Sequence, residues 1–168
     1  KLCKEKNGCL FYASNFSIGV NIFYKVNEHL AKMMNNYSIY DVSIKEIHHI
    51  HKLDAPSGTA ITLANDIVTN LKRKSNWKSM TKNGKRRSGE TENHSDSSTL
   101  PLSDSTFLII SKREDEVPGT HLVKYSSAID DIEIKEDIGR DYVVIHTSKR
   151  IAKYEPVKLP SVHRKRHR

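Results

Sequence analysis

The chain has 168 residues, enough for one domain with a hydrophobic core, and 36% of them are hydrophobic. No run of 18 apolar residues and no signal-peptide pattern occurs, which argues against membrane-spanning and secreted classes. Cys3 and Cys9 do not make a disulfide framework, so we expect a reducing, cytoplasmic setting. The chain opens on Lys1 rather than Met, and we expect a fragment whose start lies upstream.

The first ordered elements are predicted before residue 35. Residues 9–12 are apolar and follow a turn signal at Asn7-Gly8, so we expect a short strand there. Ser17 can cap a helix of about residues 18–34. The apolar residues expected on the buried face of this helix recur at helical spacing; they are Ile22, Phe23, Val26, Leu30 and Met33.

Residues 40–72 predict a strand, a polar loop and a second helix. Tyr40, Val42 and Ile44 alternate as they would in a half-buried strand over 40–47. Ser57 is a plausible N-cap for a helix of about 58–72. The apolar residues of that helix share one face; they are Ala60, Ala64, Ile67, Val68 and Leu71.

The loop between these two elements carries acid/base chemistry. Histidines titrate near neutral pH, and free backbone N–H groups at Ser57, Gly58 and Thr59 would suit a carboxylate or phosphate. We expect Glu46 and Asp54 to orient neighbours or cap the turn. A zinc site is the alternative for the three histidines of this loop, which are His48, His49 and His51. Adjacent strand residues point apart and no nearby cysteine gives a zinc spacing, so we predict no metal.

The second half of the chain is mixed in character. Residues near 72–106 are basic and then rich in Ser, Thr and acidic residues, and we expect a disordered or flexible insert. We expect no nucleic-acid binding there, because Trp77 is the only aromatic residue. Strands are predicted near 107–112, 120–126 and 131–135, and residues 142–146 can form another. The pattern predicts an α+β fold, a mixed β-sheet covered on one face by helices.

The fifteen residues from Glu46 to Ala60 resemble the signature of dihydrodipicolinate reductase, also named 4-hydroxy-tetrahydrodipicolinate reductase. That signature is an acidic residue, any residue, two histidines, two positions, Lys, any residue, and Asp-Ala-Pro-Ser-Gly-Thr-Ala, and every fixed position is present. Residues 15–21 resemble the family's second signature, between its nucleotide and substrate domains. Gly119 and His121 match a Gly-x-His element of a sheet strand, where we expect His121 to be structural. The resemblance ends at about Lys135.

The resemblance implies reduction of 4-hydroxy-tetrahydrodipicolinate by NADPH or NADH in lysine and diaminopimelate biosynthesis. It implies that His48 is the general acid/base and that Lys52 stabilises developing charge. His51 is our candidate for a merely structural histidine. The residues implied in ligand binding are His49, Gly58 and Thr59 for substrate carboxylates and Ala13, Ser14, Asn15 and Phe16 for the nicotinamide.

The same resemblance divides the chain into three parts. Residues 1–16 would end the nucleotide-binding domain, 17–135 would form a substrate-binding and tetramerisation domain, and 136–168 a divergent basic tail. No Gly-rich dinucleotide fingerprint occurs in the chain, so the Rossmann domain is absent from it and we expect no activity from it alone. The alternative is a non-catalytic remnant that serves assembly or binds an acidic partner; the first reading implies a cytoplasmic homotetramer.

Overall fold

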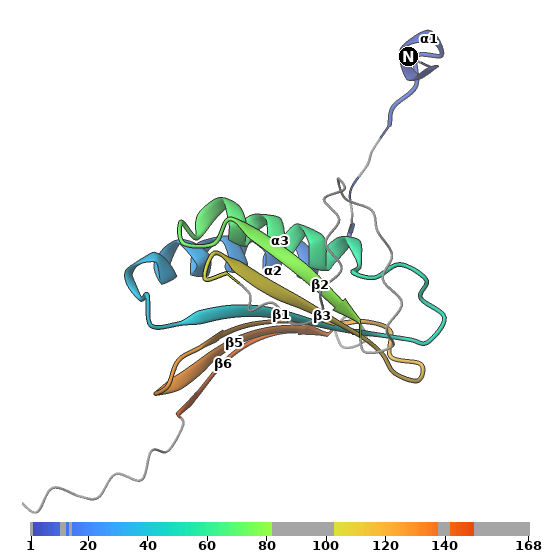
Figure 1. Cartoon of the computed structure of the whole chain (residues 1–168). Coiled ribbons are helices and arrows are strands. Elements are labelled where there is room, and N and C mark those ends of the chain that lie inside the picture. Colours follow the sequence, from blue (N-terminus) through green and yellow to red (C-terminus); the bar gives the residue numbers. More distant parts are fainter. Residues whose placement is uncertain (1, 11–12, 14, 82–102, 138–141, 150–168) are drawn as a thin grey trace, which may run out of the picture.

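The computed structural model describes residues 2–10, 13, 15–81, 103–137 and 142–149. In that part of the chain a six-stranded sheet carries two long helices on one face, which confirms the predicted α+β class (Figure 1). The helices are α1 (Leu2–Glu5), α2 (Ile18–Met33), the 3₁₀ turn η1 (Met34–Asn36) and α3 (Gly58–Asn70). The strands are β1 (Asp41–His48), β2 (Asn76–Thr81), β3 (Thr106–Arg113), β4 (Thr120–Ser126), β5 (Asp130–Asp137) and β6 (Tyr142–Lys149).

The sheet is mixed, with strand order β2-β3-β1-β4-β5-β6. Strand β3 runs parallel to both β1 and β2, whereas β4, β5 and β6 continue the sheet from β1 in antiparallel pairs. A parallel arrangement needs a crossover between strands, and α3 supplies it between β1 and β2. The carboxyl end of β1 therefore leads directly into the loop that starts α3.

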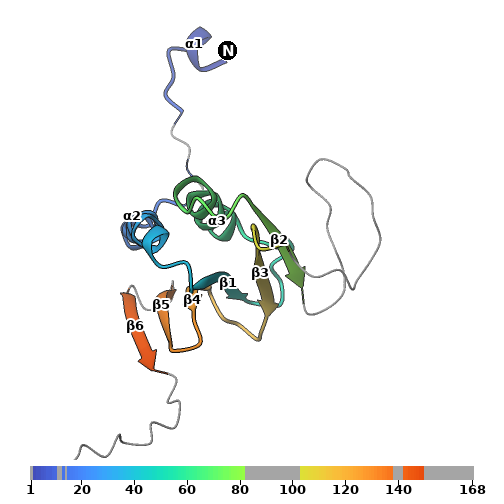
Figure 2. The same cartoon turned by 60° about the vertical axis from the view of Figure 1, so that its left-hand side comes forward.

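The two long helices run parallel to each other. The Asn27 side-chain amide donates to the Leu63 carbonyl at 3.0 Å, and the Asn35 amide donates to the Asn70 carbonyl at 2.7 Å. Because the sequence separation is nearly the same in both pairs, the helices advance in the same direction. Their N-termini consequently lie at one end of the layer (Figures 1 and 2).

Both predicted N-caps are confirmed. Ser17 Oγ accepts the Val20 amide at 3.4 Å, and Ser57 Oγ accepts the Ala60 amide at 3.2 Å. Each bond satisfies one of the amides that a helix start leaves without an intrahelical acceptor. Helix α3 thus begins after Ser57, as expected, and its predicted apolar face is turned toward the core.

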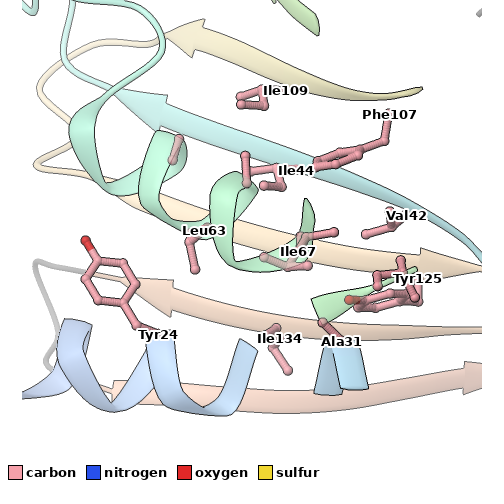
Figure 3. Close-up of a cluster of buried hydrophobic side chains, with 14 of the residues drawn as sticks. Tyr24, Ala31, Val42, Ile44, Leu63, Ile67, Phe107, Ile109, Tyr125 and Ile134 are labelled. Atoms are coloured by element: carbon pink, nitrogen blue, oxygen red, sulfur yellow. The ribbon is translucent and has the colours of Figure 1, made fainter. Parts of the chain in front are cut away.

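The hydrophobic core lies between the helices and the sheet (Figure 3). Val42 and Ile44 of β1 pack there with Leu63 and Ile67 of α3, and all four are buried. Burying one side chain of this size contributes roughly 1.5–3 kcal/mol. The alternation predicted for 40–47 is therefore correct, and it continues in the same phase to Glu46 and His48.

The buried face of α2 differs from our prediction. Phe23 is buried, and Val26 and Leu30 are partly buried, but Ile22 is 54% exposed and Met33 is 49% exposed. The helix is rotated toward α3 because Asn27 bonds to the α3 backbone and must lie inward. The residues that the helix buries are Val20, Phe23, Tyr24, Asn27 and Ala31.

Two other expectations are corrected or extended by the strands. Part of the predicted insert is ordered, because Asn76–Thr81 forms β2 beside β3; residues 82–102 lie outside the described part. Strand β6 confirms the prediction for 142–146 and carries the sheet beyond Lys135, while 150–168 lie outside the description.

The start of the chain is also corrected. Leu2–Glu5 is a helical turn, Cys9 and Leu10 are in no strand, and residues 11–12 are not described. No helix in the described residues is long and apolar enough to cross a membrane.

Candidate active site

A row of polar side chains crosses the sheet near the carboxyl end of β1. Glu46 of β1 lies opposite Ser111 of β3 and His121 of β4, and His121 lies opposite Glu136 of β5. Direct cross-strand neighbours share a face of the sheet. All four residues are buried on the face that carries the core further along the same strands. The helix-covered face is thus apolar along most of its length and polar at this one end.

His48 is the last residue of β1 and lies over this row. Its Nε2 atom is 3.3 Å from His121 Nε2 and 3.5 Å from Glu46 Oε2, and the ring is buried. The two imidazoles meet edge to face with centroids 5.1 Å apart. His48 is therefore a buried acid/base group held by two others.

Glu46 is a buried carboxylate that stays ionised. Its Oε2 atom accepts the Ser57 amide at 3.0 Å, and the Arg113 guanidinium lies 3.6 Å from Oε1. Burial favours the neutral acid, but hydrogen bonds from His48 and Ser57 outweigh it and lower the pKa of Glu46 to about 2. Glu46 thus orients its neighbours, as predicted.

Arg113 also holds the loop that follows β1. Its Nε atom donates to the Lys52 carbonyl at 3.2 Å, and Nη2 donates to the Asp54 carbonyl. Lys52 Nζ pairs with the Asp54 carboxylate at 2.8 Å, and hydrogen bonding to Lys52 lowers the Asp54 pKa despite partial burial. Among the described residues, no hydrogen bond or ion pair joins Lys52 directly to His48.

The predicted substrate-binding residues lie directly after β1 and at the start of α3. Gly58 is exposed as the first residue of the helix, Thr59 is buried, and His49 is half-buried directly after β1. The expectation of three free amides was wrong for Ser57, whose N–H already donates to Glu46. His51 is exposed and lies 3.5 Å from Glu116, so it has no core packing role.

The predicted nicotinamide segment lies at the N-terminus of α2. Asn15 Oδ1 accepts the Ser17 amide at 2.8 Å, and Phe16 is 59% exposed. Ala13 is exposed, and Ser14 lies outside the described residues. Because α2 and α3 run parallel, this segment is at the same end of the layer as the loop of His48.

The cluster also has the make-up of a metal site. Glu46, His48 and His121 each offer a ligand atom, and these atoms lie within 4.8 Å of one another. However, the Ser57 amide and the Arg113 guanidinium already face the two Glu46 oxygens. A metal cation would have to compete with the guanidinium, so the hydrogen-bonded description fits this residue set better.

Sequence reasoning missed Glu136 and Arg113 and gave His121 only a structural role. The sequence did carry one signal, the alternation of buried residues along each strand. Arg113, His121 and Glu136 occupy the alternating positions that bury Ile109, Val123 and Ile134 on β3, β4 and β5. A charged residue on a buried face requires a partner. Which strands would supply it depends on register, which the sequence does not display.

Comparison with known proteins identifies the family. The family model "Dihydrodipicolinate reductase, C-terminus" matches residues 19–153. The chain belongs to this family. The match extends beyond Lys135, where the recognisable motif residues end, and it includes the whole of β6.

Two dihydrodipicolinate reductases resemble the chain in part. The 4-hydroxy-tetrahydrodipicolinate reductase of Christiangramia forsetii is 42% identical over 134 residues, which are 80% of this chain and 48% of that protein. The chain therefore spans about half the length of this curated relative. A solved structure, dipicolinate-bound dihydrodipicolinate reductase from Paenisporosarcina sp. TG-14, is 20% identical with a TM-score of 0.46, covering 74% of this chain and 41% of that one.

Proposed function

We propose that the chain is the substrate-binding part of an NADPH- or NADH-dependent reductase that converts 4-hydroxy-tetrahydrodipicolinate to tetrahydrodipicolinate in lysine and diaminopimelate biosynthesis. The observation that carries the proposal is buried His48 at the carboxyl end of β1, beside the capped N-terminus of α3, in a chain of this family. The division into residues 1–16, 17–135 and 136–168 remains part of this proposal.

His48 is the proton donor in this proposal. Reduction of an unsaturated ring adds a hydride to one atom and a proton to its neighbour, and the proton must come from a positioned acid. His48 is buried away from bulk water, and the Glu46 carboxylate lies 3.5 Å from its Nε2 atom. Positioned acid/base groups contribute about 10²–10⁴-fold to rate.

The start of α3 and its loop would capture the substrate carboxylates. The Gly58 and Thr59 amides belong to the first turn of α3, where N–H groups lack intrahelical acceptors and the helix dipole favours negative charge. Lys52 adds a cation from the same loop, and His49 adds a second polar contact. Lys52 Nζ pairs with the Asp54 carboxylate at 2.8 Å, so we expect substrate to compete with Asp54 for Lys52.

In this proposal the described residues would supply only part of a nicotinamide nucleotide site. Exposed Phe16 and its neighbours lie at the correct end of the helix layer to contact a nicotinamide ring, which supplies the hydride when bound. The chain contains no Gly-rich turn for the pyrophosphate. A few ring contacts cannot offset the roughly 4–15 kcal/mol lost on immobilising a ligand.

Calorimetric titration of the chain tests the binding half of the proposal. We expect weak binding of dipicolinate, as a stable dicarboxylate probe, and no measurable binding of NADPH. Lys52→Ala should abolish the dipicolinate signal, whereas Lys78→Ala on edge strand β2 is the matched control and should leave it unchanged. Micromolar NADPH binding, or dipicolinate binding that survives Lys52→Ala, would contradict the assignment.

Turnover tests the chemical half, in a complete reductase that contains this domain. His48→Gln should lower turnover by about 10²–10⁴-fold with little change in cofactor affinity. His51→Gln is the matched control, since His51 is an exposed histidine of the same loop. Near-normal turnover of the His48 variant would refute the assignment of His48 as the proton donor.

Assembly is a further part of the proposal. The described residues place both long helices on one face of the sheet, and the opposite face is available for contact between copies (Figure 2). We propose a cytoplasmic homotetramer formed through that face, which is the mode of assembly that the family resemblance implies. Light scattering that shows a strict monomer of the complete enzyme would refute this.

A further inference from the structure

His121 lies directly behind His48 and is completely buried. Its Nδ1 atom is 3.1 Å from Glu136 Oε2, and its Nε2 atom is 3.3 Å from His48 Nε2 and 3.1 Å from Ser57 Oγ. Both ring nitrogens thus face a polar partner within hydrogen-bonding reach. A buried histidine needs partners for both ring nitrogens, and the identity of these partners decides which nitrogen carries the proton.

These contacts determine where the protons lie. A carboxylate accepts only, so Glu136 requires a proton on His121 Nδ1, and neutral His121 then presents a lone pair at Nε2. His48 Nε2 faces that lone pair and the Glu46 carboxylate, so both of its neighbours are acceptors. The proton of neutral His48 consequently belongs on Nε2, and Nδ1 is the nitrogen that can exchange a proton with a ligand.

The charges around the pair support the same assignment. Glu46 and Glu136 are buried carboxylates, while Arg113 is the one guanidinium that lies beside Glu46 within the described cluster. The cluster therefore holds more carboxylate acceptors than guanidinium donors. Both contacts of His48 to His121 and Glu46 are made through Nε2, so a proton exchanged at Nδ1 leaves them undisturbed.

We propose that His121, held by Glu136, is a positioning residue that keeps the Nε2 proton on His48 and thereby reserves His48 Nδ1 for proton transfer. The proposal rests on the proposed function, in which His48 is the proton donor. His121 touches neither substrate nor cofactor in it. Its contribution is to select one of two tautomers of the residue in front of it.

The test is nitrogen-15 NMR of the imidazole rings in the complete chain, at a pH where both rings are neutral. We expect His121 protonated at Nδ1 and His48 at Nε2, each with a tautomer ratio of roughly 10 or more, because hydrogen bonds involving charged groups are strong enough for that bias. Glu136→Gln should bring both ratios toward unity, since a glutamine amide can donate as well as accept. Glu133→Gln on the same strand is the matched control and should change neither.

His121→Gln is the second variant, and it should bring the tautomer ratio of His48 toward unity. If it does not fold, the wild-type spectrum and Glu136→Gln still decide the matter. A proton on His121 Nε2 in the wild type, or a His48 ratio unchanged in Glu136→Gln, would overturn the proposal. Spectra that change on dialysis against a chelator would also overturn it, in favour of a metal at Glu46, His48 and His121.

The outcome separates this inference from the proposed function. Normal turnover of His48→Gln in a complete reductase would refute the proton-donor role that the proposed function gives to His48, whatever the tautomers are. Unchanged tautomers with a severe His48→Gln defect would refute only the role of His121.

Discussion

Replacement of Glu46 by glutamine tests the buried charge at the centre of the site. The side chain keeps its shape in Glu46→Gln but loses the negative charge that faces Arg113 and His48. The amide oxygen can still accept the Ser57 N–H, so the start of α3 retains one of its contacts. The substitution therefore removes mainly the electrostatic part of the cluster.

The magnitude follows from the pKa of Glu46, which is lowered from 4.5 to about 2 in the folded chain. A group whose pKa is depressed by folding stabilises the protein at pH values above its unfolded pKa, and this stabilisation is lost as pH falls through the folded pKa. For Glu46 the loss falls between about pH 4.5 and 2 and amounts to about 3 kcal/mol. The variant cannot titrate at this position, so the stability difference between the two proteins should shrink by about that amount over the same interval.

Urea unfolding between pH 5 and 2, followed by Trp77 fluorescence, measures the difference. Trp77 is the only tryptophan and its indole donates to Asn65 of α3 at 3.2 Å, so its emission reports contact between β2 and the helix layer. Glu116→Gln is the control, because that side chain is 79% exposed. A difference between wild type and Glu46→Gln that does not vary with pH would refute the reasoning.

Three further predictions concern single groups, each measured by urea unfolding. Ser57→Ala should lower the free energy of unfolding by about 1 kcal/mol through loss of the α3 cap, and Ser57→Thr should restore most of it; equal stability of all three would contradict the capping role. Tyr125→Phe should leave stability unchanged or raise it by up to ~1 kcal/mol, because the buried hydroxyl has no hydrogen-bond partner among the described residues, and a clear loss would show a missed partner. Burial and the nearby Glu28 charge raise the Asp66 pKa to about 6, so the wild type should lose stability as pH rises from 4 to 7 and Asp66→Asn should not; parallel pH profiles would contradict this.

The local parts of the fold were predictable because their causes are local. Ser17 and Ser57 accept amides three residues away, and the alternation of Val42 and Ile44 follows from the pleat of one strand. Strand β2 was not predicted because it is an edge strand with only Trp77 and Thr81 partly buried, so it shows no hydrophobic alternation. The orientation of α2 also escaped prediction, since it depends on a bond between Asn27 and another helix.

The candidate site divides in the same way. His48, Lys52, Gly58 and Thr59 lie within one short segment and were found by its motif. His121 and Glu136 join His48 only through the pairing of β1 with β4 and of β4 with β5. Pairing between distant strands is a property of the assembled sheet, so a single sequence indicates that a buried polar residue needs a partner but not which residue supplies it.

The row of polar residues Glu46, Ser111, His121 and Glu136 also affects the register in which the strands pair during folding. Sliding β4 by one residue along β1 would turn His121 to the opposite face and bring Thr120 or Leu122 beside Glu46. Sliding it by two residues preserves the faces but places Val123 or Gly119 opposite Glu46, which removes a polar neighbour from a buried carboxylate at a typical cost of several kcal/mol. Purely apolar strands would tolerate such a two-residue shift far better. The residues proposed for proton transfer therefore also discriminate against misaligned sheets, and their replacement by apolar side chains should permit alternative strand pairings even where it leaves overall stability intact.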